Sequence, residues 1–99
     1  MNMLITGSNG FIGRNLSKQL KEKFNYNITE LNRNNCNLLD QKSVDNFFIS
    51  HNKKYDLVLH TAIEGGRRNK PDNPELVFNN LLMLYNLLTY QNYFQCIVS

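Results

Sequence analysis

The sequence predicts an α/β fold, a doubly wound parallel sheet that is truncated after its fifth strand. Short apolar runs alternate with stretches of helical periodicity along the 99 residues, as in successive β-α-β units with right-handed crossovers. The run Leu57-Val58-Leu59 is apolar without alternation, as expected for a parallel strand that is covered on both faces. Such sheets usually continue for at least another strand, so we expect a piece cut from a larger fold.

Composition and charge indicate one globular domain over residues 1–99. Hydrophobic residues make up 41% and charged residues 19%, which excludes disordered and collagen-like chains. The net charge of +3 comes from scattered basic residues, so we expect no nucleic-acid partner. There is no signal peptide and no apolar run of the roughly 18 residues that a membrane span needs, so we expect a cytoplasmic protein with no membrane partner. Cys36 and Cys96 lie far apart, which favours free thiols and no metal site.

The first predicted elements are a strand at 3–6 and a helix at 11–24. Met3-Leu4-Ile5 is a short apolar run that ends just before a glycine. Apolar residues of the helix recur at three- and four-residue steps, which predicts that this face packs on the sheet. These residues are Phe11, Ile12, Leu16, Leu20 and Phe24.

The middle of the chain predicts a second strand at 28–31 and a helix behind Asp40. The Asp40 side chain is expected to cap the free backbone N–H groups of that helix. Between the two elements, Cys36-Asn37-Leu38 is a candidate for a very short third strand. The apolar stripe of the helix is formed by Val44, Phe47 and Phe48.

The last part of the chain predicts a fourth strand at 56–60, a long helix at 74–90 and a fifth strand from residue 95. The long helix is apolar nearly all round, whereas one sheet-facing stripe needs fewer apolar positions. We therefore expect a second buried surface on this helix, formed by another helix or another subunit.

The glycine-rich loop at 6–13 is the most informative segment. Gly7, Gly10 and Gly13 lie between a predicted strand and a predicted helix. In that context the first glycine permits a tight turn, the second lets a pyrophosphate approach the backbone, and the third lets the helix pack close to the sheet. The anion would bind at the helix N-terminus. The alternative of three turn glycines without a ligand is disfavoured by the strand–turn–helix context.

Residues 6–13 match the motif TGxxGFIG throughout, and in this the chain resembles the extended short-chain dehydrogenase/reductase family. That family contains NAD(P)-dependent sugar-nucleotide epimerases, dehydratases and reductases, and the resemblance implies a Rossmann-like fold. Asn37-Leu38-Leu39-Asp40 resembles the family's D-L-x-D segment, with Asn in place of the first Asp, and His60-Thr61-Ala62 resembles its H-x-A motif. The resemblance covers essentially the whole chain but only the family's N-terminal half.

The resemblance implies a set of cofactor-binding residues. Asp40 is expected to face the adenine, and the residues after the fourth strand are expected to line the cofactor. His60 is expected to pack at the strand end, with direct chemistry as the less favoured alternative. The complete expected set is Gly7, Asn9, Gly10, Phe11, Ile12, Gly13, Arg33, Leu39, Asp40, Thr61, Ala62 and Ile63.

Within the family, the GDP-L-fucose synthases are the branch that the chain resembles best. The segments at 37–40, 44–48, 62–66 and 80–83 are similar to segments of that branch, whereas Arg67-Arg68 departs from it. The match supports a relative of that enzyme more firmly than its identity.

Two interpretations of the end of the second strand favour different cofactors. If the strand ends at Leu31, Asn32 and Arg33 follow, and a basic residue there accommodates the 2′-phosphate of NADP. If Glu30 points at the ribose instead, NAD is favoured. The fucose synthases that the chain resembles use NADPH, so NADP(H) is favoured over NAD(H).

Family members catalyse with a Tyr-x-x-x-Lys pair and with a Ser or Thr at the end of the fifth strand. No Tyr of this chain has Lys four residues later, so we expect the isolated 99-residue chain to be inactive. Ser99 falls where the catalytic Ser would fall, with an ordinary strand-end serine as an equal alternative. Arg67, Arg68 and Lys70 are candidates to bind a sugar-nucleotide phosphate or to form a solvated basic loop.

Three hypotheses for function follow. The first is the cofactor-binding portion of an NAD(P)-dependent nucleotide-sugar epimerase/reductase, which transfers a hydride between nicotinamide and a nucleotide-sugar. The second is a non-catalytic stub that binds a dinucleotide or a protein, and the third is a non-functional truncation. Helices at this place often build a dimer interface in the family, so a homodimer through the helix at 74–90 is expected. Its contacts would be Leu81, Leu84, Tyr85 and Leu88.

Overall fold

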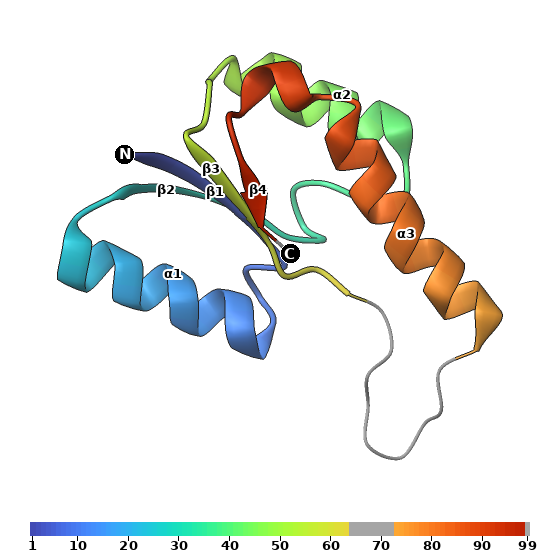
Figure 1. Cartoon of the computed structure of the whole chain (residues 1–99), viewed down its shortest axis with the longest axis horizontal. Helices are drawn as coiled ribbons and strands as arrows, with labels where there is room; N and C mark the ends of the chain where they lie inside the picture. The colour runs from blue at the N-terminus through green and yellow to red at the C-terminus, as the bar shows by residue number, and fades with distance from the viewer. Residues whose placement is uncertain (64–72, 99) are drawn as a thin grey trace.

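The computed structural model describes residues 1–63 and 73–98, which form a four-stranded parallel sheet flanked by helices (Figure 1). α1 covers one face of the sheet, whereas α2 and α3 lie over the opposite face. The strands are β1 (Asn2–Thr6), β2 (Asn27–Leu31), β3 (Leu57–His60) and β4 (Ile97–Val98). The helices are α1 (Phe11–Phe24), α2 (Gln41–His51) and α3 (Pro74–Leu88), and the short 3-10 helix η1 (Gln91–Tyr93) follows them.

The strand order β2-β1-β3-β4 puts a reversal of direction between β1 and β3. β2 lies on one side of β1, and β3 and β4 follow on the other side of β1. Every neighbouring pair is parallel, so all the carboxyl ends lie at one edge of the sheet. Ligands of open parallel sheets bind at such a switch point. The predicted doubly wound fold is therefore confirmed, and the ends of β1 and β3 mark the expected place of a site.

The candidate third strand at 36–38 does not form, so the described residues contain four strands and the predicted fifth strand is β4. The N–H of Cys36 donates to the carbonyl of Asn32 (3.0 Å), and the N–H of Asn37 donates to the hydroxyl of Ser43 (2.8 Å). These bonds close a local turn and tie the segment to α2. The prediction was wrong because so short a run does not reveal whether its amides bond to a strand or to a turn.

The main apolar core lies between the sheet and the layer formed by α2 and α3. Phe48 of α2 is central to it, because its ring stacks on Tyr90 (5.0 Å between centroids) and meets Tyr93 (5.4 Å). The Tyr90 hydroxyl also donates to the carboxylate of Asp45 (2.8 Å), which fastens the segment after α3 to α2. The stripe predicted for α2 is thus buried. The core further includes Leu4, Leu31, Leu38, Val44, Phe47, Val58 and Leu87.

The apolar stripe that predicted the packing of α1 lies largely in solvent. Phe11, Ile12 and Phe24 are 78%, 62% and 57% exposed. The residues of α1 that are buried are Gly13 and Ser17. This part of the prediction was wrong because a helix that approaches a sheet closely does so through small residues, which give no hydrophobic signal.

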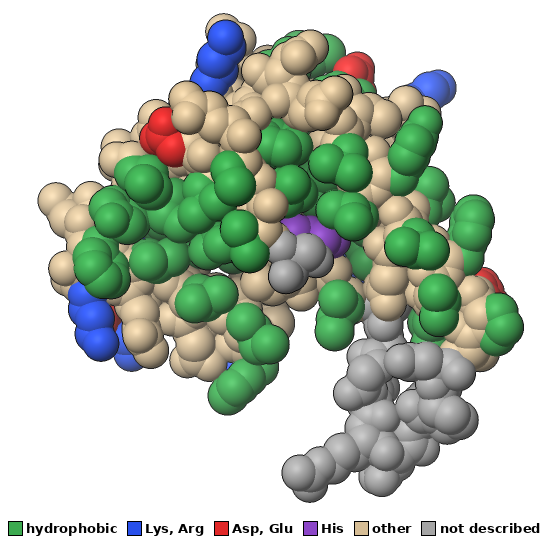
Figure 2. Space-filling model, in the orientation of Figure 1, with side chains coloured by type: hydrophobic (Ala, Val, Ile, Leu, Met, Phe, Trp, Pro, Cys, Tyr) green, Lys and Arg blue, Asp and Glu red, His purple; other side chains and the backbone are tan. Residues whose placement is uncertain are grey.

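α3 also presents an apolar face to solvent. Met83 and Leu87 face the core, whereas Phe78, Leu81 and Tyr85 are each 63% exposed. Figure 2 shows hydrophobic side chains along α3, at the right of the view, and further ones over α1 at the left. The sequence predicts a second buried surface on this helix. The apolar face is present, but it lies in solvent among the described residues, so its burial by another helix or another subunit stays a prediction.

The helices within residues 1–63 and 73–98 are too short or too polar to cross a membrane. The same residues contain no group of three or more His, Cys, Asp or Glu side chains that could hold a metal ion. Cys36 is a buried free thiol and Cys96 an exposed one.

Phe48→Ala is expected to lower the free energy of unfolding by about 3–5 kcal/mol, because it deletes a 1% exposed ring from the centre of the core. Urea unfolding followed by circular dichroism measures the loss. Ile49→Ala on the same helix is the control, because that side chain is 58% exposed and its loss should stay within about 0.5 kcal/mol. Equal losses in the two variants would contradict this description of the core.

Candidate functional site

A cavity of about 670 Å³ opens at the carboxyl ends of β1 and β3. Four segments far apart in the sequence line it: the glycine loop with the start of α1, the residues after β2, the residues before α2 and the residues after β3. α3 contributes Met83. The volume is typical of sites for small molecules and cofactors. The cavity therefore lies at the switch point of the sheet.

The turn after β1 depends on the absence of side chains at Gly7 and Gly13. Gly7 has a φ of 69°, in the left-handed region that favours glycine. A Cβ atom on Gly7 would lie 2.7 Å from the backbone nitrogen of Ala62, and one on Gly13 would lie 2.8 Å from the hydroxyl oxygen of Thr61. The predicted tight turn and the predicted close packing of the helix are both present. Together they bring the start of α1 against the residues that follow β3.

The N-terminus of α1 differs from the other two because no side chain caps it. Asp40 accepts a hydrogen bond from the N–H of Lys42 at the start of α2, and Asn73 accepts one from the N–H of Leu76 at the start of α3. At α1 the N-cap is Gly10, and the first turn holds no acidic residue. The first N–H groups of a helix have no partner within it. This end of α1 therefore offers hydrogen-bond donors and the positive end of the helix dipole to the cavity.

The end of β2 presents a cation to the cavity and turns its carboxylate away. Glu30 accepts hydrogen bonds from the hydroxyl of Ser17 (2.6 Å) and the ammonium of Lys21 (3.1 Å), both on α1. The hydrogen bond from Ser17, with that from Lys21, lowers the pKa of the Glu30 carboxyl below its usual value. Residues 32–34 line the cavity instead, with Arg33 among them. Glu30 thus points away from the cavity, and Arg33 leaves the cavity edge at the end of β2 basic.

The segment before α2 forms an apolar wall of the cavity. Leu38 and Leu39 line it together with Met83. Asn86 of α3 holds this segment in place, because its buried side-chain amide donates to the carbonyl of Leu38 (2.8 Å). Such a wall suits the apolar or aromatic part of a ligand.

The titratable side chains among the described residues that line the cavity are Arg33 and Cys36. Burial raises the pKa of the Cys36 thiol, so the thiol stays protonated near neutral pH. The Arg33 guanidinium is a planar cation with five N–H donors and no acceptor. Because the thiol keeps its proton and the guanidinium offers only donors, this part of the cavity is suited to holding an anionic ligand rather than to proton transfer.

The structure brings together nearly all of the residues expected to bind a cofactor. Each of them lines the cavity except Asp40, whose carboxylate caps α2 as predicted. Seven further described residues line the cavity outside the expected set: Leu31, Asn32, Asn34, Cys36, Asn37, Leu38 and Met83. The position of Asn34 just after a strand was a usable signal, whereas nothing in the pattern of the long helix distinguishes Met83. Ser99, Arg67, Arg68 and Lys70, the candidates for catalysis and for binding a substrate phosphate, lie outside the described residues.

Comparison with known proteins connects this geometry to a family. A sequence profile of the NAD dependent epimerase/dehydratase family matches residues 3–96. The chain belongs to that family. The match spans every segment that lines the cavity, so the site is built from residues that the family profile covers.

Three relatives illustrate the similarity. GDP-L-colitose synthase from Yersinia pseudotuberculosis is 31% identical over 91 residues, which are 90% of this chain and 29% of that protein. The structure of a GDP-D-glycero-L-gluco-heptose synthase from Campylobacter jejuni, determined in the presence of NADPH, has a TM-score of 0.76 and 23% identity over 92% of this chain and 27% of that one. The GDP-L-fucose synthetase of Naegleria fowleri, bound to NADP, has a TM-score of 0.71 and 21% identity over 92% of this chain and 26% of that one. The two structures show a shared fold, and this chain spans less than a third of each relative.

Proposed function

We propose that this chain binds a nicotinamide dinucleotide, NADP(H) in preference to NAD(H), as the cofactor-binding part of a nucleotide-sugar epimerase/reductase. The observation that carries the proposal is the uncapped N-terminus of α1, which meets a cavity with Arg33 at its edge. Free N–H groups at a helix end bind phosphate oxygens. Membership of an NAD dependent family agrees with this ligand.

The residues of the cavity fit the parts of such a cofactor. The N-terminus of α1 would hold the pyrophosphate beside Gly10, where the nearest atom to an added Cβ would be the Gly7 carbonyl oxygen at 3.2 Å. Leu39 and Met83 would hold the adenine, and residues 61–63 would lie toward the nicotinamide. When bound, the cofactor would supply the hydride, and these residues would bind the cofactor and orient it.

Two observations support the preference for NADP(H). The carboxylate of Glu30, which could otherwise bind the ribose hydroxyls, is occupied by Ser17 and Lys21. Arg33 lies at the cavity edge, and guanidinium groups bind phosphate oxygens in bidentate fashion. In addition, two similar structures were determined with NADPH or NADP.

The names of the relatives support a GDP-sugar as the substrate class. All three act in the synthesis of GDP-linked sugars, as their names state. In this proposal the complete enzyme resembles GDP-L-fucose synthases and transfers a hydride between nicotinamide and a carbon of the sugar. Ser99 would orient the substrate oxygen.

We also propose that the protein forms a homodimer through α3. Phe78, Leu81 and Tyr85 recur at three- and four-residue steps and are each 63% exposed. Residues at such spacing lie on one face of a helix. A second copy of this face would remove the apolar area from water.

Gly10→Val is expected to weaken NADPH binding by about 100-fold, or ~2.8 kcal/mol, because a branched side chain would occupy the place of the pyrophosphate. Fluorescence titration with NADPH measures the dissociation constant. The backbone of Gly10 (φ −76°, ψ 168°) is extended, a conformation that any residue adopts, but an added Cβ would lie 3.2 Å from the Gly7 carbonyl oxygen. The melting temperature is therefore measured alongside, to separate a loss of binding from a loss of folding. Unchanged NADPH binding would contradict the pyrophosphate assignment.

Arg33→Ala is expected to weaken NADPH binding by about 10- to 100-fold, because it removes one charge-assisted contact to the 2′-phosphate. NADH binding should stay within about twofold of the unchanged chain, because NADH lacks that phosphate. Titration of both cofactors against both proteins gives the selectivity. Equal losses for NADPH and NADH would contradict the role of Arg33.

Leu81→Glu is expected to convert a dimer to a monomer, because it puts a charge at the centre of the exposed face of α3. Light scattering after size-exclusion chromatography measures the mass. Ile49→Glu, at a 58% exposed position on α2, is the matched control and should remain dimeric. A monomeric unsubstituted chain, or a dimer that survives Leu81→Glu, would rule out this interface.

A further inference from the structure

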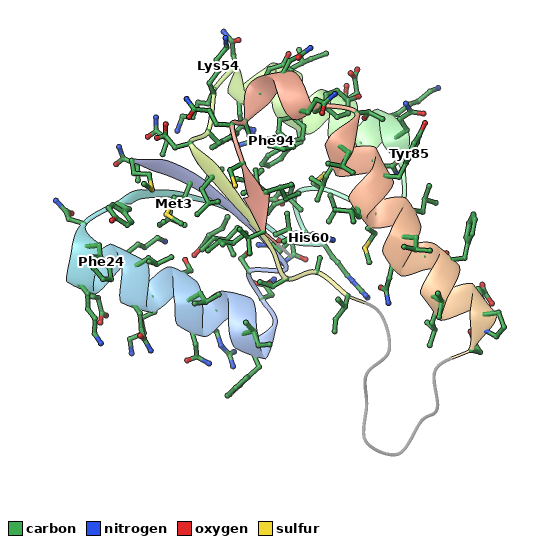
Figure 3. The ribbon with its side chains drawn as sticks, in the orientation of Figure 1. Met3, Phe24, Lys54, His60, Tyr85 and Phe94 are labelled. Carbon is green, nitrogen blue, oxygen red and sulfur yellow. The ribbon has the colours of Figure 1, made fainter. Side chains whose placement is uncertain are left out.

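A buried side-chain pair joins β1 to β3 behind the wall of the cavity. Thr6 and His60 are the last residues of their strands and stand opposite each other in the parallel register. They are 0% and 7% exposed, and 2.7 Å separates the Thr6 hydroxyl oxygen from Nδ1 of His60. Figure 3 shows His60 where the carboxyl ends of the strands converge. Neither side chain lines the cavity, so the pair stands behind its wall.

The donors around Thr6 determine the direction of this hydrogen bond. The hydroxyl oxygen accepts hydrogen bonds from the backbone N–H groups of Thr61 (3.1 Å) and Ala62 (3.3 Å). A threonine hydroxyl has two lone pairs and one proton. Because both lone pairs are used, the proton points at Nδ1 of His60. This direction makes His60 the acceptor and requires a neutral imidazole that carries its own proton on Nε2.

The same bonds set the position of Ala62 against the glycine turn. A Cβ atom on Gly7 would lie 2.7 Å from the backbone nitrogen of Ala62, which shows how closely the two segments approach. The hydroxyl of Thr61 adds a second tie, because it donates to the carbonyl of Thr6 (2.6 Å). Gly7, Thr61 and Ala62 all line the cavity. The spacing between the glycine turn and the segment after β3 thus depends on which hydrogen bonds the Thr6 hydroxyl can accept.

We propose that neutral His60 is a positioning residue, which sets the spacing of the cofactor cavity by accepting a hydrogen bond from the hydroxyl of Thr6. The cofactor itself is part of the proposed function, on which this inference rests. His60 acts through Thr6 and the two backbone amides, and it does not contact the ligand.

Protonation of His60 would disrupt this arrangement. A protonated imidazole carries a hydrogen on Nδ1 and would have to donate to an oxygen whose lone pairs are both in use. The N–H of Ala62 would lose its acceptor, whereas the N–H of Thr61 also reaches the carbonyl of Thr6 (3.3 Å) and would keep one. Ala62, which lines the cavity, would then no longer be held against Thr6.

The surroundings of His60 favour its neutral form. Burial lowers the pKa of His60 from its usual 6.5, and no charged group contributes to that shift. The neighbouring strands β1 and β4 carry no titratable side chain in their described residues. Across this face, α3 carries Glu75 and Tyr85, which are both exposed. The titratable residues of α2 are Lys42, Asp45 and His51, of which Asp45 is bonded to Tyr90 and His51 to the carbonyl of Phe47.

The sign of the pH dependence follows from this lowered pKa. The unfolded chain takes up a proton at His60 near pH 6.5, and the folded chain takes it up only at lower pH. The stabilising contribution is therefore fully present above that pH and is lost as the pH falls through the lower, folded pKa. Cofactor affinity should fall in the same direction.

The test compares NADP⁺ dissociation constants between about pH 5 and pH 8 for the unchanged chain, His60→Asn and His60→Leu. The Oδ1 of Asn can replace Nδ1 as the acceptor but does not titrate, whereas Leu has no acceptor. We expect the unchanged chain to lose about tenfold in affinity at the acid end, His60→Asn to lose markedly less, and His60→Leu to be about tenfold weaker throughout. The 2′-phosphate of NADP⁺ titrates near pH 6 with all three proteins. The contribution of His60 is therefore the difference in pH dependence between the unchanged chain and the two variants.

His51→Asn is the matched control, because His51 is the other histidine of the chain and lies on α2. This variant should keep the full loss of NADP⁺ affinity at acid pH, which is called the acid step below. A step that persists in His60→Asn, or one that disappears in His51→Asn, would overturn the proposal. Equal affinities of His60→Asn and His60→Leu at neutral pH would also overturn it.

The tautomer of His60 gives a measurement that needs no cofactor. Long-range ¹H–¹⁵N spectra of the free chain should show a neutral ring with the proton on Nε2, and a proton on Nδ1 at neutral pH would overturn the proposal. If the unchanged chain binds no dinucleotide, the proposed function and the positioning role fail together. If it binds and the tautomer is wrong, the positioning role fails alone.

Discussion

The close approach between the end of β1 and the residues after β3 is the constraint on which the rest of the structure depends. A Cβ on Gly7 would collide with the backbone of Ala62, and hydrogen bonds from residues 61 and 62 to Thr6 hold the two segments together. Parallel strands end at one edge of a sheet, so this single contact places the glycine turn, the start of α1 and the segment after β3 around one space. The cavity exists because these segments meet without side chains between them.

The electrostatic character of that cavity depends on where the acidic side chains are used. Glu30 accepts hydrogen bonds from α1, Asp40 caps α2, and Asp45 accepts a hydrogen bond from the hydroxyl of Tyr90. Among the described residues, the groups left facing the cavity are the N–H donors of α1 and the guanidinium of Arg33. A phosphate-bearing ligand would meet no competing carboxylate there. The anion selectivity proposed for the cavity would thus depend as much on acids that are satisfied elsewhere as on Arg33, the cation among the described lining residues.

The two apolar faces that remain open on the helices have different physical origins. On α1 the small residues Gly13 and Ser17 occupy the buried face, and Phe11 and Ile12 are exposed at the helix start, where they line the cavity. α3 exposes Leu81 and Tyr85 because it is apolar nearly all round and one side of it, with Met83, already faces the core and the cavity. The same helix therefore forms part of the cavity wall and carries the surface proposed for dimerisation.

The sequence by itself determined the glycine turn, the cap at Asp40 and the order of the elements, apart from the strand expected at 36–38, which does not form. These features depend on periodicity and on hydrogen bonds between residues a few positions apart, which spacing records directly. Only the tertiary structure decided which way Glu30 points, that the apolar stripe of α1 faces solvent, and that Met83 belongs to the cavity. The tertiary structure also brought Thr6 against His60, which are 54 residues apart in the sequence. Such contacts depend on how separate elements pack, and that packing leaves no local pattern in the chain from which it could be inferred.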